Sequence, residues 1–475
     1  MKLKSSLPAA LKYQAVIIES AARDAGLDFY EVIFELLEAS DVNGIAAYGG
    51  FPVRYPSWRF GMDFERLEKG RTWGLSKIYE LVINNDPTYA YLVQSNSLLE
   101  QKLVMAHVFG HADFFKHNIW FAPTDRRMID TMGEHATRIR RIIDVVGQDR
   151  VEEFMDRALS MESMIDPYKP LRDAKQTRPQ ATRVASLSER SRLALEELSS
   201  TPNQSGESTP VAVQSEQTSS GELSDYPTYD ILGFLSENAP LEAWQRSIME
   251  IVRREAYYFS PQRMTKIMNE GWACYWHSKL LTGGLLDASE ILDFADAHSG
   301  ATASQPGQLN PYKLGIELFR FADECGEDIF RLRSVHNDVS LIDKLADESF
   351  TERFLRSPEP ASSAMHDEQM EAPPTWREVK AQTLHRLSWG GLPQIELTGI
   401  GATGELLLIH RHDGRDLQLG ETGETLKCMA GIWQAPVHLL TLEDGQGRLV
   451  IAADGQVTVS EADSAQADCR TDSAA

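Results

Sequence analysis

The feature that most constrains the fold is the stretch AHVFGHADFF at residues 106–115, which places two histidines on an apolar helical stripe. At about 100° per residue, His107 and His111 fall on one helix face, and Glu100 lies on the same face seven residues before His107. The stripe also carries Val104, Val108 and Phe115. A buried carboxylate costs several kcal/mol unless it is paired, hydrogen-bonded or bound to a metal. The chain must therefore supply polar partners for this stripe.

A second helical stretch far along the chain offers such partners. The segment NEGWACYWHSKLL at residues 269–281 places Glu270 and His277 on one face, flanked by apolar residues. Imidazoles on adjacent helical turns can bind one ion, and a further ligand normally comes from another helix. The sequence therefore predicts a divalent-metal centre, with zinc as one candidate ion and His107, His111, Glu270 and His277 as ligands. The alternative is that these histidines are core residues hydrogen-bonded to nearby carboxylates.

Composition narrows the class of protein. A net charge of −23 at pH 7 without a basic patch disfavours nucleic-acid binding. No apolar run reaches the about 18 residues of a membrane span, and the first residues lack the pattern of a secretion signal. The four cysteines show no CxxC spacing, which argues against a disulfide framework. We therefore expect a cytoplasmic protein without a membrane span.

The apolar periodicity predicts a mainly α-helical N-terminal body followed by a small C-terminal α+β domain. Helical spacing begins with a long helix or helix pair over residues 8–40, and residues 1–170 and 225–356 are expected to be two halves of one helical domain. Between them, residues 171–224 are rich in Ser, Thr and Gln, which predicts a disordered insert. A linker is expected at 357–374, a sheet domain with hairpins at 375–460 and a loose tail at 461–475.

The residue after His107 limits the chemistry of such a centre. In zinc peptidases with two histidines at this spacing, that residue is a glutamate that acts as general base, whereas here it is Val108. Hydrolysis would therefore need another acid. The candidates are Glu100, Asp113 on the same helix, and Glu255, which shares an apolar helix face with Ile248 and Val252.

Several long stretches resemble the SpoVR family, named from stage V sporulation protein R. They include FPVRYPSWRFGM, NNDPTYAYLVQSNSLLEQKLVMAHVFGHADFFKHN, APLEAWQRSIMEIVRREAYYFSPQ, MNEGWACYWHSKL and GELLLIHRHDGRDL. The resemblance covers most of residues 8–170, 225–355 and 376–450. It implies a link to formation of the spore cortex in spore-forming bacteria, and it implies no particular reaction.

A second resemblance concerns the histidine pair alone. HVFGH followed far downstream by NEGWA is similar to the gluzincin type of zinc peptidase, in which the two histidines and the downstream glutamate are the ligands. It implies His107, His111 and Glu270 as ligands, with Val108 as the departure. Two hypotheses follow. One is a metal-dependent hydrolase acting in cell-envelope or stress physiology, and the other is a non-catalytic scaffold whose C-terminal domain binds a partner protein.

Overall fold

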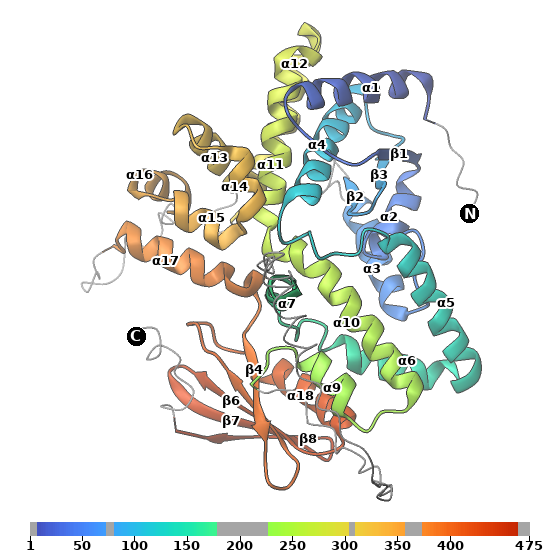
Figure 1. The fold of residues 1–475 in the computed structure, drawn as a ribbon, viewed down its shortest axis with the longest axis vertical. Coiled ribbons are helices and arrows are strands. Elements are labelled where there is room, and N and C mark those ends of the chain that lie inside the picture. Colours follow the sequence, from blue (N-terminus) through green and yellow to red (C-terminus); the bar gives the residue numbers. More distant parts are fainter. Residues whose placement is uncertain (1–6, 73–79, 178–226, 304–308, 357–372, 464–475) are drawn as a thin grey trace, which may run out of the picture. The chain divides into compact units, whose positions relative to one another are not determined.

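The computed structural model describes residues 7–72, 80–177, 227–303, 309–356 and 373–463. It confirms the expected fold class, since the body is mainly helical and a small α+β region follows at the C-terminal end (Figure 1). The chain divides into two compact units, one of residues 1–167 and 226–475 and one of residues 168–225. In the second unit the structure describes helix α7 (Lys169–Thr177). The predicted insert, linker and tail lie almost entirely outside the described residues.

The first hundred residues contain a small sheet that the apolar spacing did not predict. Helix α1 (Ala9–Asp24) is followed by strand β1 (Val32–Leu37), so the helix expected over residues 8–40 is wrong in its second half. Strand β1 pairs in parallel with β3 (Thr88–Val93), and β2 (Leu81–Ile83) pairs with β3 on the other side in antiparallel fashion. A short apolar run fits either a helix or a strand. Residues 32–37 form a strand because their backbone pairs with β3. Helices α2 (Ala39–Ala47) and α3 (Trp58–Thr72) lie between β1 and β2 in the sequence.

Helix α4 (Leu98–His117) carries the predicted histidine stripe and is buried on nearly all sides. It begins with a capping box, in which the Ser97 hydroxyl accepts from the Glu100 backbone N–H at 3.2 Å and the Glu100 carboxylate accepts from the Ser97 N–H at 2.7 Å. Helices α5 (Met128–Val146) and α6 (Gln148–Leu159) follow. A helix that is buried all round forms the core of a domain, and α4 has this role here.

The second helical stretch completes the body. Helix α11 (Lys266–Leu280) packs against both α4 and α13 (Pro311–Glu324), and Figure 1 shows α4 and α11 side by side. Helix α10 (Ala243–Met264) contacts α5 and α6. The remaining elements of this part are α9 (Ile231–Asn238), η1 (Leu281–Leu285), η2 (Ala288–Glu290), α12 (Ile291–Thr302), α14 (Ile329–Val335), α15 (Asp338–Leu345), α16 (Glu348–Phe350), η3 (Thr351–Leu355) and α17 (Trp376–Leu387).

Glycines allow these core helices to approach closely. A Cβ atom at Gly110 would lie 2.7 Å from the Cα of Ala273. Helices α4 and α11 therefore pack so closely at Gly110 that no side chain fits between them. On another face of α11, a Cβ at Gly271 would lie 2.2 Å from the backbone carbonyl carbon of Gly315 in α13. Gly110 lies between the two histidines in sequence and Gly271 follows Glu270, so the close contacts fix the spacing of the helices at the polar cluster.

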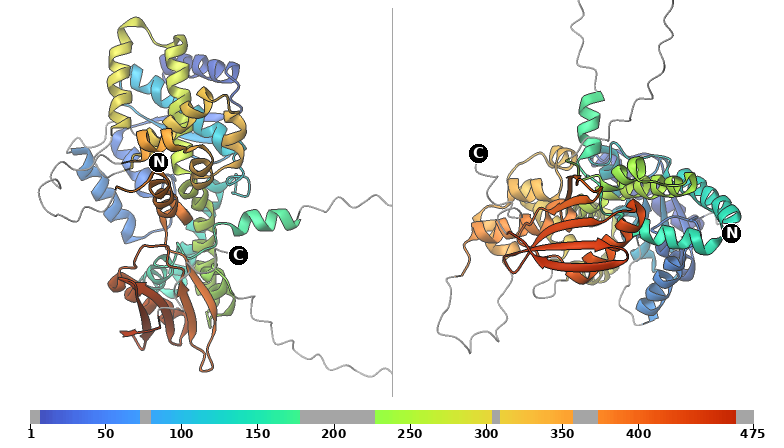
Figure 2. Two further views of the ribbon diagram at one scale, coloured as in Figure 1. Left: turned by 90° about the vertical axis from the view of Figure 1, so that its left-hand side faces the viewer. Right: turned by 90° about the horizontal axis from the view of Figure 1, so that it is seen from below.

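The C-terminal region is a mixed five-stranded sheet, as the alternating pattern predicts. The strand order is β4-β5-β6-β7-β8, and Figure 2 shows the five strands in orange and red. Strands β5 and β6 are parallel and are linked by helix α18, whereas the other neighbours are antiparallel. Asp-Gly turns at 444–445 and 454–455 have positive φ at both residues, which suits tight hairpins. The elements are η5 (Ser388–Gly391), β4 (Ile395–Ile400), β5 (Leu406–His410), α18 (Leu419–Trp433), β6 (Val437–Glu443), β7 (Gln446–Ala453) and β8 (Gln456–Glu461).

The sheet shares one hydrophobic core with part of the helical body. Buried residues of the strands, such as Leu397 and Val437, belong to the same cluster as Ile139 of α5 and Ile248 of α10. The domain boundaries given above stay predictions. Among the described helices, none is long and apolar enough to cross a lipid bilayer.

Candidate metal centre

Helices α4 and α11 bring three of the predicted ligands together. The Nε2 atoms of His107 and His111 lie 3.5 Å and 3.6 Å from the same oxygen, Oε2 of Glu270. Both imidazoles are almost fully buried, with exposed fractions of 2% and 3%. The four-residue spacing in α4 and the glycine contact with α11 together place the three side chains at one point.

A fourth side chain, Glu80, joins the cluster from the loop just before β2. Its Oε2 lies 3.0 Å from His107 Nε2, and its Oε1 accepts a hydrogen bond of 3.0 Å from the hydroxyl of Tyr312 in α13. Sequence reasoning missed both residues. Glu80 lies outside the two histidine-bearing stretches at residues 106–115 and 269–281, and no periodic pattern connects residue 80 with α4 or α11. The signal that could have found it is the absent base at Val108, which calls for an acid from another element.

Two buried atoms of this cluster lack hydrogen-bond partners among the described residues. They are His107 Nε2 and Glu270 Oε2, the atoms that face each other at 3.5 Å. Ligand atoms from Glu80, His107, His111 and Glu270 all lie within 4.8 Å of one another. Buried polar atoms are normally hydrogen-bonded. A metal ion needs several nitrogen or oxygen atoms that converge on one point with free lone pairs. The residues present therefore fit a divalent ion.

The other ring nitrogens of the histidines are held by a second layer of polar groups. His111 Nδ1 lies 2.9 Å from Oδ1 of Asn269, and His107 Nδ1 lies 2.9 Å from Nδ1 of His277. His277 Nε2 in turn lies 3.0 Å from Nδ1 of His298 in α12. The predicted ligand His277 thus contacts the Nδ1 side of His107, whereas Glu270 faces its Nε2 side. His107, Cys274 and His277 form a second group of side chains that could hold a metal ion. Such contacts orient metal-binding imidazoles.

Charge inside the cluster shifts the pKa values in opposite directions. Burial alone would raise the pKa of Glu80, but the neighbouring charge on His107 outweighs it and lowers this pKa to about 2. Burial opposes the charge on His107, yet the carboxylate of Glu80 raises its pKa well above the ordinary value. Burial and the charge on His107 lower the pKa of His111. Without a cation, the cluster therefore holds a proton on His107 beside an ionised Glu80.

This arrangement predicts that metal affinity rises with pH. An ion must displace the proton of His107, because only a neutral imidazole can coordinate through Nε2. Since the pKa of His107 is raised, the proton is present at neutral pH and is lost only as pH rises toward that pKa. We expect the association constant for Zn²⁺ to increase about tenfold per pH unit above pH 6.5 for one displaced proton. Competition titration against a chromophoric chelator at several pH values measures it, and a flat profile would contradict the exchange.

The three acids predicted as candidate bases lie outside this cluster. Glu100 is occupied in the capping box at the start of α4. Asp113 is fully buried and receives two hydrogen bonds from Arg333, one from Trp272 Nε1 and one from the backbone N–H of Asp28. Glu255 pairs with Arg54 at 2.7 Å and with His135 at 2.8 Å. Of the three acids, Asp113 and Glu255 are buried and Glu100 is half-buried, and helical spacing does not show which partner satisfies each charge.

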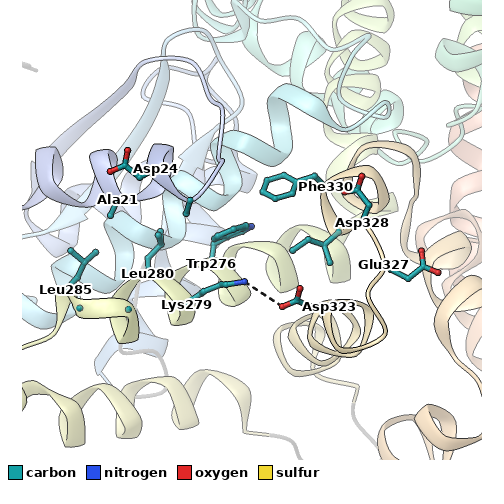
Figure 3. A pocket seen from close by; sticks show the side chains of 14 residues that line it. Ala21, Asp24, Trp276, Lys279, Leu280, Leu285, Asp323, Glu327, Asp328 and Phe330 are labelled. Carbon is teal, nitrogen blue, oxygen red and sulfur yellow. Dashed lines mark ion pairs between the residues drawn. The ribbon is translucent and has the colours of Figure 1, made fainter.

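A separate cavity of about 710 Å³ lies along another face of α11 (Figure 3). Its walls include Trp276 and Lys279 of α11, Asp24 at the end of α1, and Phe330 of α14. Lys279 lies 3.6 Å from Asp323 across the cavity, as the dashed line shows. None of the four clustered ligand residues lines this cavity, so it is distinct from the candidate metal centre.

Comparisons with known proteins show which family this chain belongs to. A family model described as "SpoVR like protein" matches residues 6–389, which include all four clustered ligand residues. The chain is also 30% identical to "Uncharacterized protein YcgB" of Escherichia coli (strain K12), and the match covers 89% of this chain and 90% of that protein. No solved structure gives a significant match.

Proposed function

Because the chain belongs to the SpoVR-like family and carries a buried His/Glu cluster that could hold a metal, we propose that it is a metal-dependent hydrolase. His107, His111 and Glu270 are the proposed ligands, and Glu80 is the proposed base. The observation that carries the proposal is the pair of buried, unpartnered atoms, His107 Nε2 and Glu270 Oε2, which converge within reach of His111. His107 Nε2 also lies 3.0 Å from Oε2 of Glu80, at the distance of an ion pair, but neither His107 Nε2 nor Glu270 Oε2 forms a hydrogen bond among the described residues.

The types of ligand favour a catalytic ion. Two imidazole nitrogens and one carboxylate are a set that zinc accepts, and catalytic zinc sites combine three protein ligands with an open position. A divalent ion held by these three residues would supply a Lewis acid and would lower the pKa of a bound water to about 7. Glu80 and Tyr312 then remain as polar groups around the open position, joined by their hydrogen bond of 3.0 Å.

Glu80 has the properties that the absent acid at position 108 should have. Its carboxylate is ionised at neutral pH in the metal-free cluster, and a nearby cation would also favour the ionised form, so its Oε2 could accept a proton from an attacking water. Tyr312 holds the other oxygen, Oε1, and thereby orients the carboxylate. In this proposal the base comes from the loop before β2 and not from the histidine helix.

A closed structural ion is the second candidate, and one observation favours it. All four ligand residues lie within 4.8 Å of one another, so Glu80 could complete a tetrahedral set and leave no open position. Such a centre would suit the scaffold hypothesis, in which the C-terminal sheet binds a partner protein.

Metal content tests for the centre itself. We expect protein purified without added metal to contain about one divalent ion per chain, and the variant with His107→Ala and His111→Ala to lose it, because an HxxxH pair supplies two of the ligands. His385→Ala is the matched control, since His385 is exposed on α17 and far in sequence from the cluster. Elemental analysis after gel filtration measures the ion, with circular dichroism to verify folding. Near-zero metal in the wild-type chain would contradict the proposal and favour a metal-free scaffold.

The substitution Glu80→Gln separates the catalytic centre from the closed one. If Glu80 is the base, we expect the variant to keep its ion and to bind it with an affinity within about threefold of the wild type, because the three ligands remain. If Glu80 is a ligand, we expect a loss of more than about 100-fold in affinity, beyond the about 10–100-fold that the loss of a residue orienting a ligand costs. The same chelator competition measures both outcomes, and a full loss of the ion would rule out the role of Glu80 as base.

A further inference from the structure

We propose that a groove on α5 and α10, whose lining includes none of the proposed metal ligands, binds the phosphate group of a small molecule. The groove has a volume of about 860 Å³. We call it the arginine groove, and its charged and titratable side chains are Arg127, Asp130, Glu134, His135, Arg138, Arg141 and Arg254. Four guanidinium groups around one hollow are unusual in a chain of net charge −23.

Two of these arginines have no carboxylate partner among the described residues. Arg138 and Arg141 are exposed on consecutive turns of α5, and neither forms an ion pair there. By contrast, Arg254 donates to Oδ2 of Asp125 at 2.7 Å, and Nε of Arg127 lies 3.8 Å from Asp130. The groove therefore keeps a positive charge that its own acids do not neutralise.

A buried imidazole adds a second kind of anion contact. His135 lines the groove although only 6% of its surface is exposed. Its Nδ1 is held at 2.8 Å by Glu255, which is itself paired with Arg54 at 2.7 Å. The ring is thus fixed in orientation, with Nδ1–H donating to Glu255. Nε2 has no partner among the described residues, and in the neutral ring it can accept a hydrogen bond from the hydroxyl of a protonated phosphate. A ring held in this way is a fixed contact beside mobile arginines.

The size and charge of the groove favour a small phosphate compound over a nucleic acid. Guanidinium groups match phosphate oxygens in a two-pronged geometry, and small-molecule sites commonly measure about 300–1,000 Å³. A long polyanion would meet the strongly negative remainder of the chain outside the groove. A free phosphate ion and a phosphate carried by an organic group share the same recognition chemistry.

Calorimetric titration of the full chain at low salt tests the proposal, with inorganic phosphate, pyrophosphate and adenosine monophosphate as probes. We expect saturable binding that weakens about tenfold for Arg138→Ala and about 100-fold when Arg141→Ala is added, because each substitution removes one charge-assisted contact to the phosphate. Glu134→Gln should bind several-fold more tightly, since it removes a negative charge from the groove. Arg331→Ala is the matched control, because Arg331 is an exposed arginine of α14 outside the groove.

The probes also identify the source of the phosphate. Equal affinity for phosphate and adenosine monophosphate supports a site for the free ion, and tighter binding of the nucleotide supports an organic phosphate. No saturable binding at millimolar concentrations would overturn the proposal. An equal effect of Arg331→Ala and Arg138→Ala would do the same, because it would show a general charge effect. Binding only to duplex DNA or to anionic vesicles would also overturn it.

Discussion

The substitution Gly271→Ala is expected to destabilise the chain by about 3 kcal/mol or more and to abolish metal binding. The new Cβ would lie 2.2 Å from the carbonyl carbon of Gly315, and a backbone atom cannot move aside as a flexible side chain does. Overpacking of a tight core typically costs about 1–3 kcal/mol and sometimes more. Because Glu270 is the preceding residue, a shift of α11 also displaces its Oε2 from His107 and His111. Denaturant unfolding and elemental analysis measure the two effects.

Gly61→Ala provides the matched control for this prediction. Gly61 is also a glycine within a helix, α3, but a Cβ there meets no atom within 4 Å. Alanine is the better helix former, so this variant should gain about 0.5–1 kcal/mol and keep its ion. If Gly271→Ala were as stable as Gly61→Ala, the close approach of α11 and α13 would not exist in solution.

The substitution Arg333→Met is expected to destabilise the chain by about 3–5 kcal/mol, because it leaves the carboxylate of Asp113 buried without its cation. Asp113 is fully buried, and Arg333 donates to both of its oxygens, at 2.7 Å and 3.1 Å. The remaining donors, Trp272 Nε1 and the backbone N–H of Asp28, are neutral. The midpoint of guanidinium unfolding should fall accordingly, whereas the metal content of the folded protein should stay unchanged.

A second variant separates charge from packing. Adding Asp113→Asn to Arg333→Met removes the uncompensated charge, so we expect part of the lost stability to return. Arg331→Met is the control, since Arg331 is exposed on the same helix. Loss of the metal in folded Asp113→Asn protein would contradict the structural role of this acid and return Asp113 to the list of catalytic candidates.

The sequence predicted the histidine pair and its partner helix but not the complete cluster. The spacing of His107 and His111 follows from helix geometry, and the polar pair Glu270 and His277 marked the helix that packs against them. Glu80 could not be found in this way, because its position depends on the pairing of β2 with β3. Residues 32–37 form strand β1 because they pair with β3, which lies more than fifty residues further along the chain. Local apolar periodicity does not reveal such a distant pairing.

The acids were misplaced for a related reason. A helical stripe shows that a side chain is buried, but the partner that neutralises it lies in another element. Asp113 is satisfied by Arg333 from α14, and Glu255 is satisfied by Arg54, which precedes α3. In both cases the two partners lie more than two hundred residues apart in the sequence, beyond the range of any pattern read along one helix.

The wide separation of the ligand residues has a consequence for biosynthesis. Residues 80, 107, 111 and 270 meet at one point, so a nascent chain cannot form the cluster until α11 has left the ribosome. Under the proposed function, metal loading would be a late event in the maturation of each molecule, because chains that end before residue 270 would lack one of the three proposed ligands. In a cell, the loaded fraction would report how many chains have completed their folding.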